Sequence, residues 1–304
     1  MNRLLDLTSN SMQSLNKKAL LEAIANSEGR VMMAETIGTV MPMLGNITNA
    51  EFVAAMGVEM ITLNVLDVDN PTINGLVDTA DVIGKIAELT GRIIGINLEP
   101  VGQTTLDQKD NIWALSSGRK ATVANAKKAL AQGVRFITLT GNPGVGVDKQ
   151  AIAASLLELK AAVGQDMILI AGKMHASGIV NEANTKLITI EDVTNYIDNG
   201  ADIILLPAPG TIGGITQDYI ESLISYIHHR GKLAMTAIGT SQEGADVDTI
   251  KRIALMCKMA GADIHHLGDA GYLGMALPEN IFAYSVAIRG IRHTYRRMAM
   301  SIKR

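Results

Sequence analysis

The chain has few aromatic side chains and no excess of basic charge. Of its 304 residues only 3% are aromatic, and its 27 Lys and Arg are outnumbered by 30 Asp and Glu, which gives a formal net charge of −3. Nucleic-acid binding is favoured by a basic surface and by side chains that stack on bases. We therefore expect a small-molecule ligand and no nucleic acid.

The chain also has one cysteine and no long apolar run. Cys257 has no second cysteine for a disulfide or a CxxC metal motif, which suits a reducing cytoplasm. Residues 1–6 are partly polar where a signal peptide needs a continuous apolar core, and no run of 18 apolar residues occurs. We expect a cytoplasmic protein that binds no membrane.

Short apolar runs recur along the chain at nearly even intervals. Successive runs start 29 to 43 residues apart, close to the length of one strand–helix–strand unit. Strands buried on both faces of a parallel sheet read as such continuous runs. They are residues 31–34, 60–65, 93–98, 136–140, 167–171, 203–206, 233–238 and 264–267.

Helical patterns with apolar residues at i, i+3 and i+4 lie between these runs, and a glycine usually ends each one. No GxGxxG follows the first run, and no linker separates a second domain. We predict an α/β fold, a closed (β/α)₈ TIM barrel in one domain over residues 1–304. The interior helices are expected at residues 80–89, 122–131, 152–162, 190–197, 220–227 and 249–259.

A helix is expected at each end of the barrel sequence. The first, over residues 16–26, precedes the first strand and could close the N-terminal mouth. The second, from residue 278 to about 303, is long and basic. We interpret its basic side chains mainly as a solvated face that complements the helix dipole. Contact between subunits of a homo-oligomer, or capture of an anion, is the alternative. These side chains are Arg289, Arg292, His293, Arg296 and Arg297.

Catalytic residues of such barrels lie at the C-terminal ends of the strands. Asp67 and Asp69 follow the second strand and Glu99 follows the third, and carboxylate oxygens on adjacent strands are ligands that suit Mg²⁺. A plain turn is the alternative for Asp67 and Asp69, because Asn70 and Pro71 come next. Glu35, after the first strand, is a further catalytic candidate.

Lys173 and His175 follow the fifth strand two residues apart, so they would share a face. A lysine there could form a Schiff base, transfer protons, hold an anion or simply pair with a carboxylate. His265 and His266 alternate on the eighth strand, so only one can enter the mouth, where it would transfer or orient a proton. We chose His265 for that role.

The loops after the seventh and eighth strands are rich in glycine and small polar residues. Such loops can aim backbone N–H groups at an anion, and the last two strands are where barrels usually hold phosphate. The sequence therefore predicts a phosphate site there. Its residues are Gly239, Thr240, Ser241, Gly268, Asp269 and Gly271.

Several motifs together resemble an uncharacterised bacterial TIM-barrel family whose members are often labelled phosphoenolpyruvate phosphonomutase-like, or haloacid-dehalogenase-like. They are the segments 172–176, 207–211, 239–246, 265–271 and 289–297. The resemblance implies a lyase or isomerase of the phosphonomutase and isocitrate lyase kind, with Asp67, Asp69 and Glu99 holding Mg²⁺ against an enolate. The mobile Lys-Lys-Cys-Gly-His loop of that superfamily is absent, and Glu35 stands where a dehalogenase needs a nucleophilic aspartate.

Three functions are compatible with these residues. The first is a barrel enzyme that acts on a small phosphorylated or 2-oxo acid metabolite through an enolate stabilised by Mg²⁺. The second is a metal-free sugar-phosphate aldolase or isomerase that uses Lys173 as a Schiff-base nucleophile. The third is a non-catalytic protein that binds a phosphorylated metabolite.

Overall fold

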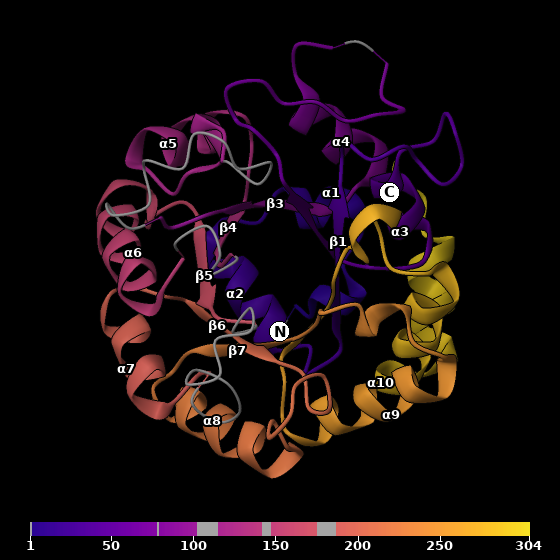
Figure 1. Cartoon of the computed structure of the whole chain (residues 1–304). Coiled ribbons are helices and arrows are strands. Elements are labelled where there is room, and N and C mark those ends of the chain that lie inside the picture. Colours follow the sequence, from indigo (N-terminus) through magenta and orange to yellow (C-terminus); the bar gives the residue numbers. More distant parts are fainter. Residues whose placement is uncertain (1, 78, 102–114, 142–146, 175–186) are drawn as a thin grey trace.

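The apolar runs form one closed parallel barrel, which confirms the predicted fold. The computed structural model describes residues 2–77, 79–101, 115–141, 147–174 and 187–304. Within them each strand pairs with the next, and the last pairs with the first (Figure 1). The strands are β1 (Val31–Ile37), β2 (Met60–Asn64), β3 (Ile93–Leu98), β4 (Phe136–Leu139), β5 (Ile168–Gly172), β6 (Ile203–Pro207), β7 (Leu233–Ile238) and β8 (Ile264–Leu267).

Helices surround this ring of strands (Figure 1). Each of α3 to α9 begins after a Thr or Asp whose side chain accepts a hydrogen bond from an N–H of the first turn, which stabilises helix starts. Among the described residues, no helix is long and apolar enough to cross a membrane. The outer helices are α3 (Asn49–Ala55), α4 (Val82–Thr90), α5 (Val123–Ala131), α6 (Lys149–Val163), α7 (Ile190–Asp198), α8 (Gln217–His229), α9 (Val247–Met259) and α10 (Pro278–Ala299).

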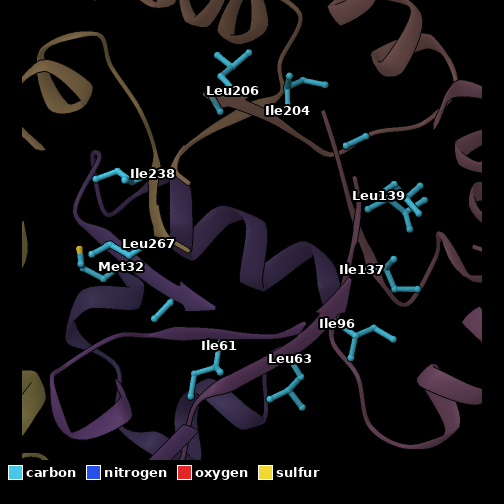
Figure 2. Packing of buried hydrophobic residues seen from close by; sticks show 14 of the residues in the cluster. Met32, Ile61, Leu63, Ile96, Ile137, Leu139, Ile204, Leu206, Ile238 and Leu267 are labelled. Atoms are coloured by element: carbon cyan, nitrogen blue, oxygen red, sulfur yellow. The ribbon is translucent and has the colours of Figure 1, made fainter. Parts of the chain in front are cut away.

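Alternation along the strands separates two apolar cores. Val31 and Met33 belong to a cluster inside the barrel, whereas their neighbour Met32 packs outward against the helices. Figure 2 shows part of the outer cluster, with Ile61 and Ile137 among its members. The same alternation decides which side chains at the strand ends face the barrel axis.

The N-terminal end of the barrel is covered by α2 (Lys17–Ala25), as the sequence predicted. Leu20, Ala23 and Ile24 of this helix join the inner cluster, together with Val31 and Ile93 at the starts of their strands. A short helix α1 (Ser9–Gln13) and a 3₁₀ turn η1 (Leu4–Asp6) precede it. The barrel interior is therefore packed from this side.

The expectation of a solvated basic face on the last helix is wrong for two of its arginines. The side chains of Arg289 and Arg297 are fully buried at the N-terminal end of the barrel, where both bind Glu59. Arg289 Nη1 lies 2.7 Å and Arg297 Nε 3.0 Å from Glu59 Oε1. The backbone turns at Gly290 (φ 74°, ψ 164°), which breaks α10 between the two arginines.

Candidate active site

Glu35 and His266 meet at the C-terminal mouth of the barrel. Met33 pairs with His266 across β1 and β8, and Glu35 follows Met33 on the same inner face. Glu35 Oε2 lies 3.6 Å from His266 Nε2, and the His266 side chain is only 6% exposed. This pair brings together a partly buried carboxyl group, whose side chain is 17% exposed, and a buried imidazole.

His265, the histidine that the sequence analysis favoured, faces away from the mouth. Its Nδ1 lies 3.0 Å from the hydroxyl of Tyr284 on α10, and its Nε2 lies 3.0 Å from the carbonyl oxygen of Gly29. Burial lowers its pKa to about 4, so it is a neutral ring packed under a helix. The prediction that His265 enters the mouth as a catalytic residue is therefore wrong. His266 occupies the position in the mouth that was predicted for His265.

Three carboxyl groups interact in the mouth. Burial raises the pKa of Glu35 well above its usual value, and the charges of Asp269 and Glu243 raise it further. Burial also raises the pKa of Glu243, with Asp269 adding to the effect. Burial lowers the pKa of His266 to about 4. The raised pKa of Glu35 and the lowered pKa of His266 both favour the uncharged forms of these side chains.

Glu243 reaches the mouth through a tight turn after β7. Thr240 (φ 59°) and Ser241 (φ 68°) are both left-handed, a conformation that costs energy for residues other than glycine and that clusters at functional sites. They lead into the 3₁₀ turn η7 (Gln242–Gly244). Asn280 of α10 donates to the carbonyl oxygens of Glu243 (2.9 Å) and Ala245 (2.8 Å), which holds the turn in place.

A row of polar side chains continues from Asp269 to the opposite wall. Asn64 Nδ2 donates to Asp269 Oδ2 (2.8 Å), and Asn97 Nδ2 lies 3.3 Å from Asn64 Oδ1. Thr138 is the register partner of Asn97 on β4. Four buried atoms of the mouth find no hydrogen-bond partner among the described residues, which marks a place where a ligand could bind. These atoms are Asn97 Oδ1, Thr138 Oγ1, Glu243 Oε2 and His266 Nδ1.

The residues predicted to hold Mg²⁺ are committed to other partners. Asp69 pairs with Lys128, which lowers its pKa, and Asp67 Oδ1 accepts from the N–H of Asp69 (2.8 Å), as in the turn considered above. Glu99 pairs with Arg119. Over the described part of the chain, no three His, Cys, Asp or Glu side chains are grouped so as to hold a metal ion. The carboxylates therefore do not fit the ion that the family resemblance implies.

The loops predicted to bind phosphate hold the protein's own carboxylates. Ala270 N donates to Glu243 Oε1 (3.0 Å), and Gly271 N donates to Asp269 Oδ1 (2.8 Å). Gly268 N is bonded to the carbonyl oxygen of Ile238 (2.9 Å). A phosphate could use the N–H groups of Ala270 and Gly271 only by displacing two carboxylates, each of which would repel it. The phosphate role of Gly239, Thr240 and Ser241 stays a prediction.

Lys173 is buried directly after β5, with 1% of its surface exposed. Ala171, two residues before it, belongs to the outer cluster, whereas Met174 packs against the inner one. The catalytic role of Lys173 stays a prediction. His175 lies outside the described residues.

The sequence analysis assigned no role to Asn64, Asn97 or Glu243. Strand alternation could have selected Asn97, because it shares the inner face of β3 with Ile93. Glu243 carries no such signal, because its entry into the mouth depends on the turn at Thr240 and Ser241.

Fold and mouth together define an α/β barrel with a buried acid and imidazole at the end where barrel enzymes carry out their chemistry. The chain belongs to the family described as Domain of unknown function (DUF7916), whose model matches residues 5–304. No curated protein matches it. Among solved structures it is similar to a 2,3-dimethylmalate lyase, described as a PEP mutase/isocitrate lyase superfamily member, with a TM-score of 0.51 and 12% identity. The match covers 87% of this chain and 82% of the lyase, and at this identity it shows a shared fold.

Proposed function

We propose that this protein is a barrel enzyme, a lyase or isomerase, that transfers a proton on a small carbonyl metabolite at Glu35 and His266. The observation that carries the proposal is the 3.6 Å approach of these two side chains in the buried mouth. Groups whose pKa values are shifted by burial and by a charged partner are characteristic of active sites. The 2-oxo acids and those phosphorylated metabolites that carry a carbonyl group, both expected from the sequence, belong to this substrate class.

Each side chain has a separate task in this chemistry. Glu35, held protonated, donates a hydrogen bond to the oxygen of a substrate carbonyl as negative charge develops there. His266 accepts the proton from the carbon beside the carbonyl through Nδ1, which has no partner among the described residues. Because its pKa is about 4, the imidazolium formed is a strong acid and returns the proton readily.

The shifted pKa values set the pH range of this activity. At acid pH, activity falls as His266 becomes protonated, near its pKa of about 4. At alkaline pH it falls as Glu35 ionises, and the raised pKa of Glu35 moves this loss above the usual range for a carboxyl group. Mg²⁺ takes no part in these steps, because the carboxylates predicted to hold it are bound to Lys128, Arg119 and a backbone N–H.

The fold supports the same class of reaction. The similar solved structure is that of a lyase, and its likeness to this chain extends over most of both chains. That likeness concerns the fold, so the assignment of chemistry depends on the mouth itself.

Exchange of substrate C–H protons into D₂O tests this proposal directly. The panel is pyruvate, hydroxyacetone, dihydroxyacetone phosphate and aminoacetone, which pair a carbonyl with a carboxylate, a hydroxyl, a phosphate or an amine. We expect proton NMR to show accelerated exchange for at least one of them. Glu35→Gln and His266→Asn should each slow it by about 100-fold or more, the usual contribution of a positioned acid or base.

Glu221→Gln provides the matched control, because Glu221 is exposed on the outer helix α8 and is not one of the mouth residues. It should exchange at the wild-type rate. Wild-type protein that leaves all four carbonyls at the background rate, or active-site variants as fast as wild type, would overturn the proposal.

A further inference from the structure

The unpartnered atoms of the mouth share one chemical property. Asn97 Oδ1 and an ionised Glu243 Oε2 can only accept hydrogen bonds, and Thr138 Oγ1 can accept as well as donate. All three residues are less than 9% exposed, so bulk water does not satisfy them. A buried acceptor without a donor is costly, and the mouth therefore favours a ligand rich in donors.

The charges in the mouth also favour a ligand rich in hydrogen-bond donors. Glu243 Oε1 is held by the N–H of Ala270, which leaves Oε2 free to face a ligand. The charged groups that act on Glu35 are the carboxylates of Asp269 and Glu243, and Asp269 also acts on Glu243. Each of these interactions between carboxylates is repulsive, and a bound cation would reverse its effect.

We propose that the mouth recognises a primary ammonium group, so that the metabolite it takes is an amine. An ammonium group has three donors, no acceptor and a positive charge. It would donate to Glu243 Oε2 and Asn97 Oδ1 and would lie among the carboxyl groups of Glu35 and Asp269. A hydroxyl group offers one donor and no charge, and a phosphate or carboxylate would meet like charge.

This inference rests on the proposed function for its site, and it adds the substrate class. It also makes a linked prediction about protons. Because a bound ammonium stabilises the ionised form of Glu243, which it contacts, it lowers the pKa of this carboxyl group and displaces its proton, whereas Glu35 keeps its proton for the carbonyl oxygen.

Three small probes test recognition without chemistry. 2-Aminopropan-1-ol, propane-1,2-diol and hydroxyacetone differ only in carrying an amine, a hydroxyl or an oxo group at the same carbon. We expect NMR titration of the full chain at pH 7.5 to show that the amine binds at least tenfold more tightly than the other two. Calorimetry of the amine in two buffers of different protonation enthalpy should show proton release.

Two conservative variants locate the binding site. Glu243→Gln keeps an oxygen for the N–H of Ala270 but loses the charge, and it should weaken amine binding by about tenfold or more, the value of a charge-assisted hydrogen bond. Thr138→Val removes one unpartnered hydroxyl and should weaken it by a smaller factor. Glu221→Gln should bind as wild type does, and thermal unfolding of each variant checks that it folds.

Equal or tighter binding of the diol or the ketone would overturn the inference, as would amine binding that Glu243→Gln leaves unchanged. The exchange assay separates this failure from failure of the proposed function. If exchange is accelerated but amines are not preferred, only the inference about the ammonium group is wrong. If amines are preferred but no carbonyl compound exchanges, only the proposed catalysis is wrong.

Discussion

The two ends of the barrel treat buried charge in opposite ways. At the N-terminal end, both oxygens of Glu59 are bonded, to Arg289, to Arg297 and to the backbone N–H of Met32 (3.0 Å). At the C-terminal mouth, the carboxyls of Glu35 and Glu243 have raised pKa values, and Glu243 Oε2 has no partner among the described residues. Glu59 therefore has all its partners within the protein, whereas Glu243 lacks a partner for one of its oxygens among the described residues. Arg92, which lies near Glu59, still has two unpartnered guanidinium nitrogens in the described part of the chain.

This contrast shows how the same fold separates stability from function. A buried charge with all its partners fixes the packing of the elements that supply them, here β2, α10 and the N-terminal turn η1. A buried charge without partners lowers stability and is retained where a ligand or a reaction uses it. The bonding of these buried carboxylates therefore distinguishes the C-terminal mouth of this barrel from its N-terminal end.

The largest effect is expected from breaking the N-terminal end. Glu59→Gln leaves Arg289 and Arg297 buried without their carboxylate and should lower the free energy of unfolding by about 3–5 kcal/mol, measured by urea denaturation. Glu88→Gln is the control, because its ion pair with Lys85 is exposed and should contribute less than about 1 kcal/mol. Similar losses for the two variants would show that the buried cluster is dispensable.

A smaller loss of stability is expected from replacing the glycine at the break in α10. Gly290 has φ 74° and ψ 164°, a conformation nearly restricted to glycine, so Gly290→Ala should cost about 1–3 kcal/mol in thermal unfolding experiments. Gly244→Ala is the comparison, because a Cβ there meets nothing within 4 Å and its φ is not left-handed. A Gly290→Ala protein as stable as wild type would show that α10 does not need its break.

The smallest effect is expected from Glu35→Gln at the mouth, and it is the only change expected to increase stability. Because the pKa of Glu35 is raised on folding, its protonated form contributes stability below the unfolded value near 4.5, and this contribution is lost as pH rises toward the folded value. The Glu35→Gln variant does not have this pH-dependent loss of stability. The difference between its free energy of unfolding and that of wild type should therefore increase with pH. Urea denaturation at pH 6, 7, 8 and 9 measures this difference.

The lowered pKa of His266 acts in the opposite direction, since it destabilises the protein as pH falls from 6.5 to about 4. Measurements at pH 7 and above therefore isolate the carboxyl group. If the difference between Glu35→Gln and wild type were constant from pH 6 to 9, Glu35 would not be the group that holds the proton.

The strands could be predicted because their signal is local. The runs at 93–98, 233–238 and 264–267 coincide with β3, β7 and β8, since strands buried on both faces need continuous apolar residues. Two helical features were missed. α3 was not among the expected interior helices, and nothing in the chain before Gly290 indicates that α10 breaks there.

The site was harder to predict, because it depends on pairings between distant residues. Alternation shows that only one of His265 and His266 enters the mouth, but the register of Met33 with His266 decides which. Glu59 was not considered, since a glutamate next to a strand usually reads as a surface residue. Its burial becomes evident only when Arg289 and Arg297 are brought beside it.

The part of α10 before the break at Gly290 connects the two ends of the barrel, because Asn280 contacts the turn of Glu243 at the mouth and Arg289 binds Glu59 at the N-terminal end. The part after the break carries Arg297 to the carbonyl oxygens of Leu4 and Leu5. Substitutions around Asn280 can therefore reshape the mouth while Arg289 and Arg297 preserve the margin of stability that such changes consume.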